Sequence, residues 1–138
     1  MAIVIDANLV VVLATKDPRA DMVGRLLQAW FDAGEDLHAP TLLLYEAANA
    51  LTRLVVAGRL SANDLAEAWR LVEEMPISLH PPSAGLQVVT TALRLRRQSA
   101  YDAAYLALAA QLGSVLWTLD GPLARNAAAL GFQVRLIE

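Results

Sequence analysis

The chain has 138 residues, of which 57 % are hydrophobic and 18 % are charged, and its formal net charge is −3. This composition excludes a disordered chain, and the negative balance excludes a nucleic-acid binder whose affinity rests on a broad basic surface. The sequence has no cysteine, no secretory signal and no apolar run of the roughly 18 to 20 residues that a membrane span needs, so we expect a cytoplasmic protein without a membrane partner.

Short β-rich runs alternate along the chain with longer helical patterns, which is typical of a parallel α/β sheet. We predict strands at 3–5, 37–39, 77–80, 115–119 and 133–137, and helices at 8–14, 19–33, 41–57, 62–74, 84–97, 100–112 and 122–130. Ser61 and Asp64 form a capping-box pattern, and four glycines mark helix ends: Gly34, Gly58, Gly113 and Gly131. Because no linker or repeat interrupts the alternation, we expect a single domain over residues 1–138.

Two aspartates stand where predicted strands end, Asp6 after the first strand and Asp120 after the fourth. In open parallel sheets, ligands bind beyond the carboxyl ends of the strands, so both are candidate site residues. Each also has a structural explanation, because Asp6 can cap the following helix and Asp120 precedes Gly121 in a turn dipeptide. Thr118 lies two residues before Asp120 and is expected to point the same way.

Glu46 falls on the apolar stripe of the predicted helix 41–57, together with Leu43, Ala47 and Ala50. A carboxylate on that stripe faces the interior, and burying it alone would cost several kcal/mol. Glu46 therefore needs a cation, a metal or several hydrogen-bond donors. A structural ion pair with an arginine is the alternative interpretation.

Asp102 opens the predicted helix 100–112, whose sequence is apolar nearly all round and rich in alanine. Such a helix is expected to be central and closely packed, so a carboxylate at its start would be aimed into a cleft. Asp102 also follows Ser99 at the spacing of a capping box, which is the structural alternative. Three or four carboxylates gathered at one sheet edge would suit Mg²⁺ or Mn²⁺, whereas without a metal they would repel one another.

Four segments, in this order and spacing, resemble the PIN domains, and among them the VapC-type toxins of prokaryotic toxin–antitoxin pairs. They are Ile-Asp6-Ala-Asn8, Tyr-Glu46-Ala-Ala-Asn49-Ala-Leu51 followed by Gly58-Arg-Leu-Ser, Tyr101-Asp102-Ala-Ala-Tyr105-Leu-Ala-Leu-Ala, and Thr118-Leu-Asp120 with Leu123 after it. The resemblance spans nearly the whole chain. It implies a three-layer α/β/α sandwich around a parallel sheet of about five strands, and a metal-dependent endoribonuclease.

The same resemblance implies a role for each matching residue. By position, four residues match the family's catalytic and metal-binding acids and two match the polar residues that support them: Asp6, Glu46, Asp102 and Asp120, and Asn8 and Thr118. The fourth acid is the most variable of the family. The implied cofactor is Mg²⁺ or Mn²⁺, and the implied partners are an RNA substrate, a cognate antitoxin protein that blocks the site, and a second copy of the chain in a homodimer.

The expected reaction is hydrolysis of an RNA phosphodiester that leaves a 5′-phosphate and a 3′-hydroxyl, and it requires no histidine. We therefore interpret His38 and His80, both in predicted strands, as structural. Arg94, Arg96 and Arg97 shortly precede Asp102 and can grip RNA phosphates or an acidic antitoxin segment. Equally, cations at the end of a helix complement its dipole.

Two rival functions remain open at this point. One is a catalytically inactive PIN-like binding module, although Asp6, Glu46 and Asp102 are all present. The other is another Mg-dependent phosphoryl-transfer α/β domain, such as a receiver or a haloacid-type phosphatase. A receiver needs a second acid beside Asp6, and such a phosphatase needs aspartate at position 8, where Asn8 stands. A nucleotide-binding fold is disfavoured because no glycine-rich loop follows the first strand.

Overall fold

The computed structural model describes residues 1–83, 85–96 and 100–138. Its centre is a parallel sheet of five strands in the order β3-β2-β1-β4-β5. The strands are β1 (Ala2–Ile5), β2 (Asp36–Pro40), β3 (Ile77–His80), β4 (Val115–Thr118) and β5 (Val134–Leu136). The helices are α1 (Ala7–Ala14), α2 (Ala20–Asp32), α3 (Leu42–Val56), α4 (Ala62–Glu74), α5 (Gly85–Arg94), α6 (Tyr101–Leu112) and α7 (Gly121–Ala129).

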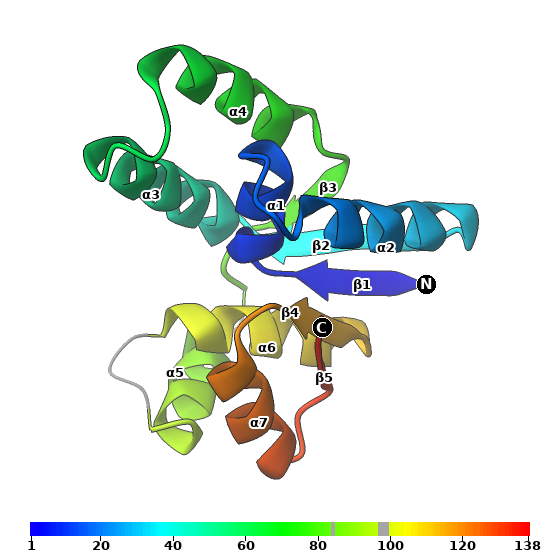
Figure 1. Cartoon of the computed structure of the whole chain (residues 1–138). Coiled ribbons are helices and arrows are strands. Elements are labelled where there is room, and N and C mark those ends of the chain that lie inside the picture. The colour runs from blue at the N-terminus through cyan, green and yellow to red at the C-terminus, as the bar shows by residue number, and fades with distance from the viewer. Residues whose placement is uncertain (84, 97–99) are drawn as a thin grey trace.

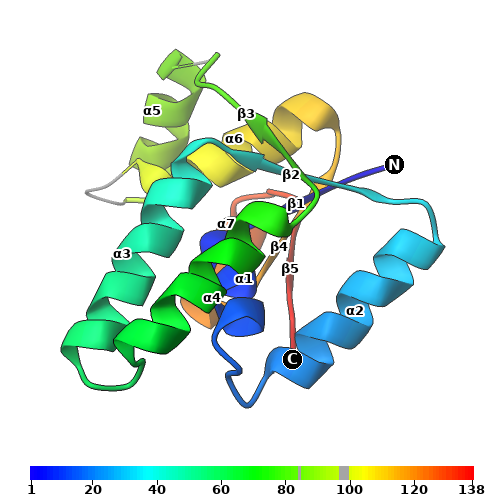
Figure 2. The ribbon, with the colours of Figure 1, turned by 90° about the horizontal axis from the view of Figure 1, so that it is seen from above.

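The helices cover both faces of the sheet, so the three-layer α/β/α architecture expected from the sequence is confirmed. Figure 1 shows α1 to α4 on one face and α5 to α7 on the other. On the first face α1 contacts α2, α3 and α4, and it lies between α2 and the α3–α4 pair in Figure 2. The connections leave β1 and β4 toward opposite faces although these strands are neighbours, which makes their carboxyl ends the switch point of the sheet.

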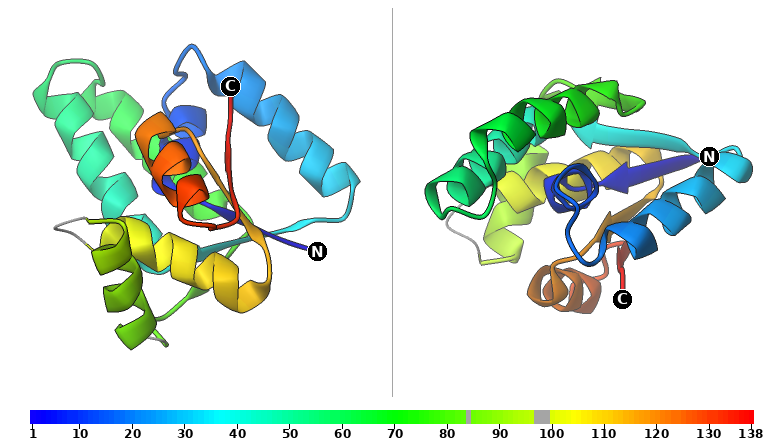
Figure 3. Two further views of the ribbon diagram at one scale, coloured as in Figure 1. Left: turned by 90° about the horizontal axis from the view of Figure 1, so that it is seen from below. Right: turned by 45° about the horizontal axis from the view of Figure 1, so that its top comes forward.

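The core lies on both sides of the central strands. Val4 and Ile5 of β1 and Leu116 of β4 are fully buried. Helix α6 contacts β1, β2 and β4, and Figure 3 shows it running across the sheet on the face that it shares with α5 and α7. Six of its residues are buried, as its nearly uniform apolar sequence predicts, so the helix packs closely against the sheet.

The predicted helix ends agree with the local chemistry of the chain. Ser61 Oγ accepts a hydrogen bond of 3.1 Å from the backbone N–H of Asp64 at the start of α4. All four glycines expected at helix ends have positive φ angles: Gly34, Gly58, Gly113 and Gly131. The helix predicted at 84–97 ends earlier, at Arg94, because Arg96 adopts a left-handed φ of 55°. Positions 84 and 97 themselves lie outside the described residues.

Two histidine side chains contribute to packing, as predicted, and two tryptophan side chains do so as well. His38 of β2 and His80 of β3 are joined by a ring-nitrogen hydrogen bond of 2.8 Å. The rings of Trp30 and Trp117 pack edge to face at 5.2 Å between centroids. Across residues 1–83, 85–96 and 100–138, no helix is both long enough and apolar enough to cross a membrane.

Candidate active site

A cavity of about 160 Å³ opens at the switch point, beyond the carboxyl ends of β1 and β4. Its lining includes all four acids singled out from the sequence, namely Asp6, Glu46, Asp102 and Asp120. Asp6 follows β1, Glu46 comes from α3, Asp102 from the first turn of α6, and Asp120 follows β4. The fold therefore brings together residues that lie up to 114 positions apart in the chain.

Asp6 is the most buried of the four acids, with 8 % of its surface exposed. It caps α1, because Oδ1 accepts a hydrogen bond of 3.4 Å from the N–H of Leu9, while Oδ2 accepts one from the hydroxyl of Thr118. Burial raises the pKa of Asp6 to about 6, against the hydrogen bonds from Thr118 and from the amides of Leu9 and Asn8, which lower it. The nearby charge of Glu46 makes a smaller contribution to this rise.

Thr118 connects the two acids that follow the strands. Its side chain is fully buried, and its hydroxyl donates to Asp6 and accepts a hydrogen bond of 3.0 Å from the backbone N–H of Asp120. The register that pairs Ile5 with Trp117 places Asp6 beside Thr118. Asp120 in turn caps α7 through a hydrogen bond of 3.0 Å from Leu123 N–H to Oδ1.

We expect Thr118→Val, which keeps the shape of the side chain, to lower the free energy of unfolding by about 1 to 3 kcal/mol. The change removes the hydroxyl that donates to Asp6 Oδ2 and accepts from the Asp120 backbone N–H. Urea unfolding would measure the effect. The matched control is Thr52→Val, where an exposed hydroxyl bonds the carbonyl of Ala48, and the expected change is within about 0.5 kcal/mol. Equal effects at the two positions would contradict a bridging role for Thr118.

Glu46 is half-buried, and its Oε1 accepts a hydrogen bond of 2.5 Å from the hydroxyl of Tyr105 in α6. Burial raises the pKa of Glu46, and the charge of Asp102 adds to this, whereas the Tyr105 hydrogen bond and the charge of Arg53 lower it. Burial also raises the pKa of the Tyr105 phenol, so the phenol stays protonated and remains a donor. Within the described residues, the expectation that Glu46 needs compensating donors is met by a tyrosine rather than by a direct arginine ion pair.

Asp102 lies in the first turn of α6, where the sequence places it. Its charge raises the pKa of Glu46, so the two carboxylates are electrostatic neighbours as well as walls of one cavity. The N-cap of α6 is Ala100, which offers no side-chain capping bond. Ser99, the partner in the alternative capping-box interpretation, lies outside the described residues.

Among the other described residues that line the cavity are four polar, basic or aromatic ones to which the sequence analysis assigned no role: Asn49, Arg53, Tyr101 and Tyr105. Helical spacing could have indicated three of them. Asn49 and Arg53 follow Glu46 by three and seven residues, and Tyr105 follows Asp102 by three, so each shares a helix face with an acid. Of the described residues in this lining, Arg53 is the only basic one.

The donor set of the cavity suits a hard divalent cation. Its acidic and amide side chains offer oxygen ligands only, and neither histidine contributes to the described lining. As the side chains stand, no three of the acidic or histidine residues in the described part of the chain converge closely enough to hold one metal ion. The carboxylates of Asp6, Glu46, Asp102 and Asp120 would therefore need to rotate toward a common point within the cavity that they line.

Comparison with known proteins decides the family. The profile of the PIN domain matches residues 3–129. The chain belongs to the PIN-domain family. The family expected from the four sequence segments is thereby confirmed, and the rival interpretations as a receiver or a haloacid-type phosphatase lose their basis.

Among relatives of this PIN domain, Ribonuclease VapC3 of Pyrobaculum aerophilum is 31 % identical over 135 residues, which cover 94 % of this chain and 98 % of the relative. The crystal structure of PAE2754 from Pyrobaculum aerophilum is similar with a TM-score of 0.66 at 25 % identity, covering 91 % of this chain and 87 % of that chain. VapC20 of Mycobacterium tuberculosis, a sarcin-ricin loop cleaving toxin, shares the fold with a TM-score of 0.66 at 21 % identity, covering 94 % and 95 %.

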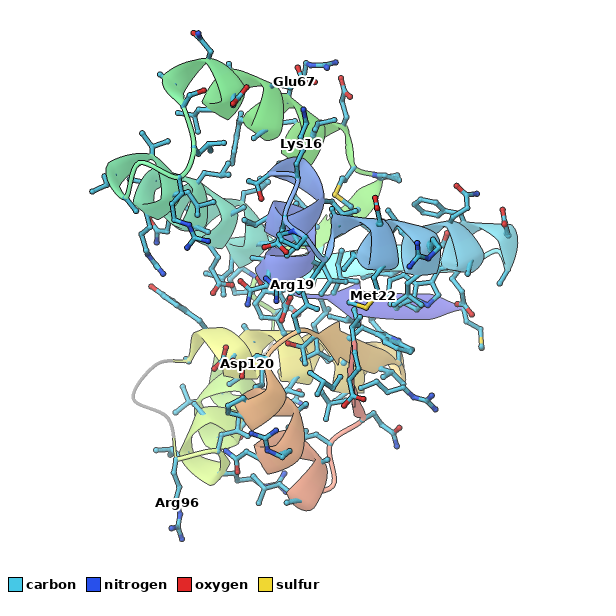
Figure 4. The ribbon with its side chains drawn as sticks, in the orientation of Figure 1. Lys16, Arg19, Met22, Glu67, Arg96 and Asp120 are labelled. Carbon is cyan, nitrogen blue, oxygen red and sulfur yellow. The ribbon has the colours of Figure 1, made fainter. Side chains whose placement is uncertain are left out.

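The three arginines expected near the site differ in their surroundings. Arg94 donates a hydrogen bond of 2.9 Å to the carbonyl of Leu130, at the end of α7, and its guanidinium lies 4.8 Å from the ring centre of Phe132. Arg94 therefore ties α5 to the segment after α7, in addition to any contact with a ligand. Arg96 is exposed and extends away from the ribbon in Figure 4. Arg97 lies outside the described residues.

Proposed function

We propose that this PIN domain is a VapC-like endoribonuclease that hydrolyses RNA phosphodiester bonds with Mg²⁺ or Mn²⁺ held by Asp6, Glu46, Asp102 and Asp120. The observation that carries the proposal is the meeting of these four acids in one cavity at the switch point of the sheet. The relative named Ribonuclease VapC3 supports the reaction class. The full set of acids disfavours an inactive binding module.

The electrostatics of the cavity support a metal requirement. Its carboxylates repel a phosphodiester, so an RNA phosphate can approach them only with a cation between. An ion bound there supplies positive charge for the phosphate and lowers the pKa of an adjacent water molecule. The protein's own contribution is placement, since Thr118 fixes Asp6 and Tyr105 fixes Glu46. Asn8 and Asn49 present polar side chains to the same cavity.

The proposal extends to the partners that VapC-type toxins have. We infer that a cognate antitoxin protein blocks the site, that Arg96 and Arg97 with Arg94 contact RNA or this antitoxin, and that the protein acts in the cytoplasm. A homodimer is also part of the proposal. Its support is an exposed apolar stripe on α5, where Leu86, Val89 and Leu93 are 78 %, 51 % and 69 % exposed.

The chemistry of the cleaved ends tests this function. Purified protein incubated with structured RNAs and Mn²⁺ should release fragments that carry a 5′-phosphate and a 3′-hydroxyl, as expected for attack by water. Ligation and phosphatase sensitivity of the fragments distinguish these ends from 2′,3′-cyclic phosphates. Cyclic phosphate products would mean attack by the RNA's own 2′-hydroxyl and would rule out the proposed reaction.

Tyr105→Phe is expected to shift the acidic limb of the pH–rate profile toward higher pH and to lower the rate at pH 7 by roughly 10-fold to 100-fold. The hydroxyl of Tyr105 lowers the pKa of Glu46, so its removal leaves Glu46 protonated over a wider range of pH. The measurement is the cleavage rate across pH in saturating Mn²⁺. The matched control is Tyr45→Phe, because Tyr45 is exposed on the same helix as Glu46 and lies outside the cavity. A profile that keeps its shape and only drops in amplitude would contradict a role through Glu46.

A further inference from the structure

A second hollow adjoins the acidic cavity along α1 and α3. It has a volume of about 540 Å³ and shares Asn8, Ala50 and Arg53 with the acidic cavity. From Arg53 it continues past Leu54 to the segment that follows α3 and to the loop between α1 and α2. The two cavities are therefore neighbours with three wall residues in common, so a chain molecule with one group in the acidic cavity has this hollow beside it.

The charge of the second hollow is opposite to that of the first. Among the described residues that line it are three arginines, Arg19, Arg53 and Arg59, against a single acid, Asp17. Arg19 holds Asp17 through two side-chain hydrogen bonds of 3.0 and 3.2 Å, so this acid is already neutralised. Figure 4 shows Arg19 between Lys16 and Asp120 in that view.

Arg53 and Arg59 keep their charge available. Within the described residues, neither guanidinium forms a hydrogen bond or an ion pair, and the two act on acids only at a distance, Arg53 on Glu46 and Arg59 on Asp17. By contrast, Arg70 is bound by Glu67 and Glu74, and Arg94 by the carbonyl of Leu130. Exposed arginines without partners in a hollow are typical of sites for an anionic ligand.

We propose that this arginine groove, formed by Arg19, Arg53 and Arg59, binds backbone phosphates of the RNA strand next to the bond that is cut, an inference that rests on the proposed nuclease function. Guanidinium groups pair with phosphate oxygens in a planar, two-pronged geometry. Because the whole chain carries a net charge of −3, its affinity for RNA must come from a local basic surface. The groove is such a surface, and Arg53 places it in contact with the acidic cavity.

Val11, Val12 and Leu54 add apolar walls to the groove. A single strand presents riboses and bases beside its phosphates, so apolar walls and guanidinium groups together match its alternating chemistry. An acidic polypeptide offers carboxylates to the same arginines and is the competing occupant. In RNA, the phosphates beside the cut bond are joined through the backbone to the phosphate that reacts in the acidic cavity. A polypeptide has no such phosphate, so we favour RNA.

Binding of a short fluorescent single-stranded RNA tests the inference. The protein carries Asp6→Asn, so that the RNA stays intact, and fluorescence anisotropy is followed over a range of salt concentrations. Arg59→Ala and Arg53→Ala should each weaken binding by roughly 10-fold. Each should also reduce the slope of log affinity against log salt by about 0.7, the value for one phosphate neutralised in a single strand. Arg59→Lys should recover most of the slope because it keeps the charge.

The matched control is Arg25→Ala. Arg25 is exposed on α2 and lines neither hollow, so its removal changes the net charge equally without touching the groove. In an otherwise unaltered protein, Arg59→Ala should raise KM for RNA cleavage with kcat little changed. The reason is that Arg59 would bind the RNA equally well in the ground state and in the transition state, so its removal weakens binding alone.

The outcomes separate the inference from the function on which it rests. RNA affinity and salt slope in Arg53→Ala and Arg59→Ala equal to those of Arg25→Ala would overturn the groove while leaving cleavage intact. Polyglutamate that binds through these arginines and is not displaced by RNA would overturn RNA binding in the groove in favour of a protein partner. Failure of the unaltered protein both to bind and to cleave RNA with Mn²⁺ would remove the nuclease function together with the groove.

Discussion

Asp6→Asn is expected to reduce metal-dependent RNA cleavage by about 10²-fold to 10³-fold, the scale of removing a principal electrostatic interaction at a reacting centre. Asp6 is almost completely buried at the end of β1, beside Thr118 and within electrostatic reach of Glu46. Asparagine keeps the size of the side chain and an oxygen that can cap α1, but it removes the negative charge. Single-turnover cleavage rates with saturating Mn²⁺ would measure the loss.

The matched control for this substitution is Asp21→Asn. Asp21 lies in the first turn of α2, where it is exposed and outside the acidic cavity, so it tests the loss of one carboxylate near a helix start without affecting the site. The Asp21→Asn protein should cleave RNA at the same rate as the unaltered protein. An Asp6→Asn protein that is folded and cleaves as fast as Asp21→Asn would show that Asp6 serves only as a helix cap.

The second large effect concerns stability in chelator. The pKa of Asp6 is about 6 in the folded protein and lies above its ordinary value of 3.8, so the folded state binds this proton more tightly than the unfolded state. The contribution of Asp6 to the free energy of unfolding is therefore most favourable at low pH, and it is lost as the pH rises from about 4 to about 6. Above that range the loss amounts to about 3 kcal/mol.

Asp6→Asn should remove this pH dependence. The variant should match the unaltered protein near pH 4 and exceed its free energy of unfolding by up to about 3 kcal/mol at pH 7 to 8. The raised pKa of Glu46 acts in the same direction, so some pH dependence should remain in the variant. Urea unfolding in chelator from pH 4 to pH 8 measures the free energy of unfolding of the variant and of the unaltered protein. A variant less stable than the unaltered protein at pH 8 would mean that capping by the charged carboxylate outweighs the cost of its burial.

The fold could be predicted from the sequence because local chemistry and long-range arrangement agree in this chain. The glycines that end helices, and the alternation of strand-like and helical segments, place element ends within a few residues of those observed. The apolar sequence of α6 already indicates its central position, and with it the place of Asp102. The early end of the helix α5 was not predictable, since a left-handed residue such as Arg96 carries no glycine signal.

The four acids that line the cavity could be picked out from the sequence, but their contacts and several of the other lining residues could not. Glu46 and Tyr105 lie 59 residues apart, and their hydrogen bond depends on how α3 and α6 approach each other across the end of the sheet. Helical spacing says which residues share a face but not which faces meet. For Asp6 and Asp120, capping and site lining appeared as competing interpretations, whereas both residues cap a helix and line the cavity.

The central claim is that the four acids form a metal-dependent RNA-cleaving site. The most direct test follows the rate of RNA cleavage against Mn²⁺ concentration for the unaltered protein and for Asp6→Asn, Glu46→Gln and Asp102→Asn, each prepared in chelator. We expect no cleavage by the unaltered protein in chelator, a saturable rise in rate with Mn²⁺, and loss of that rise in all three variants. Cleavage that persists in chelator at the same rate in the unaltered protein and in the variants would contradict the claim.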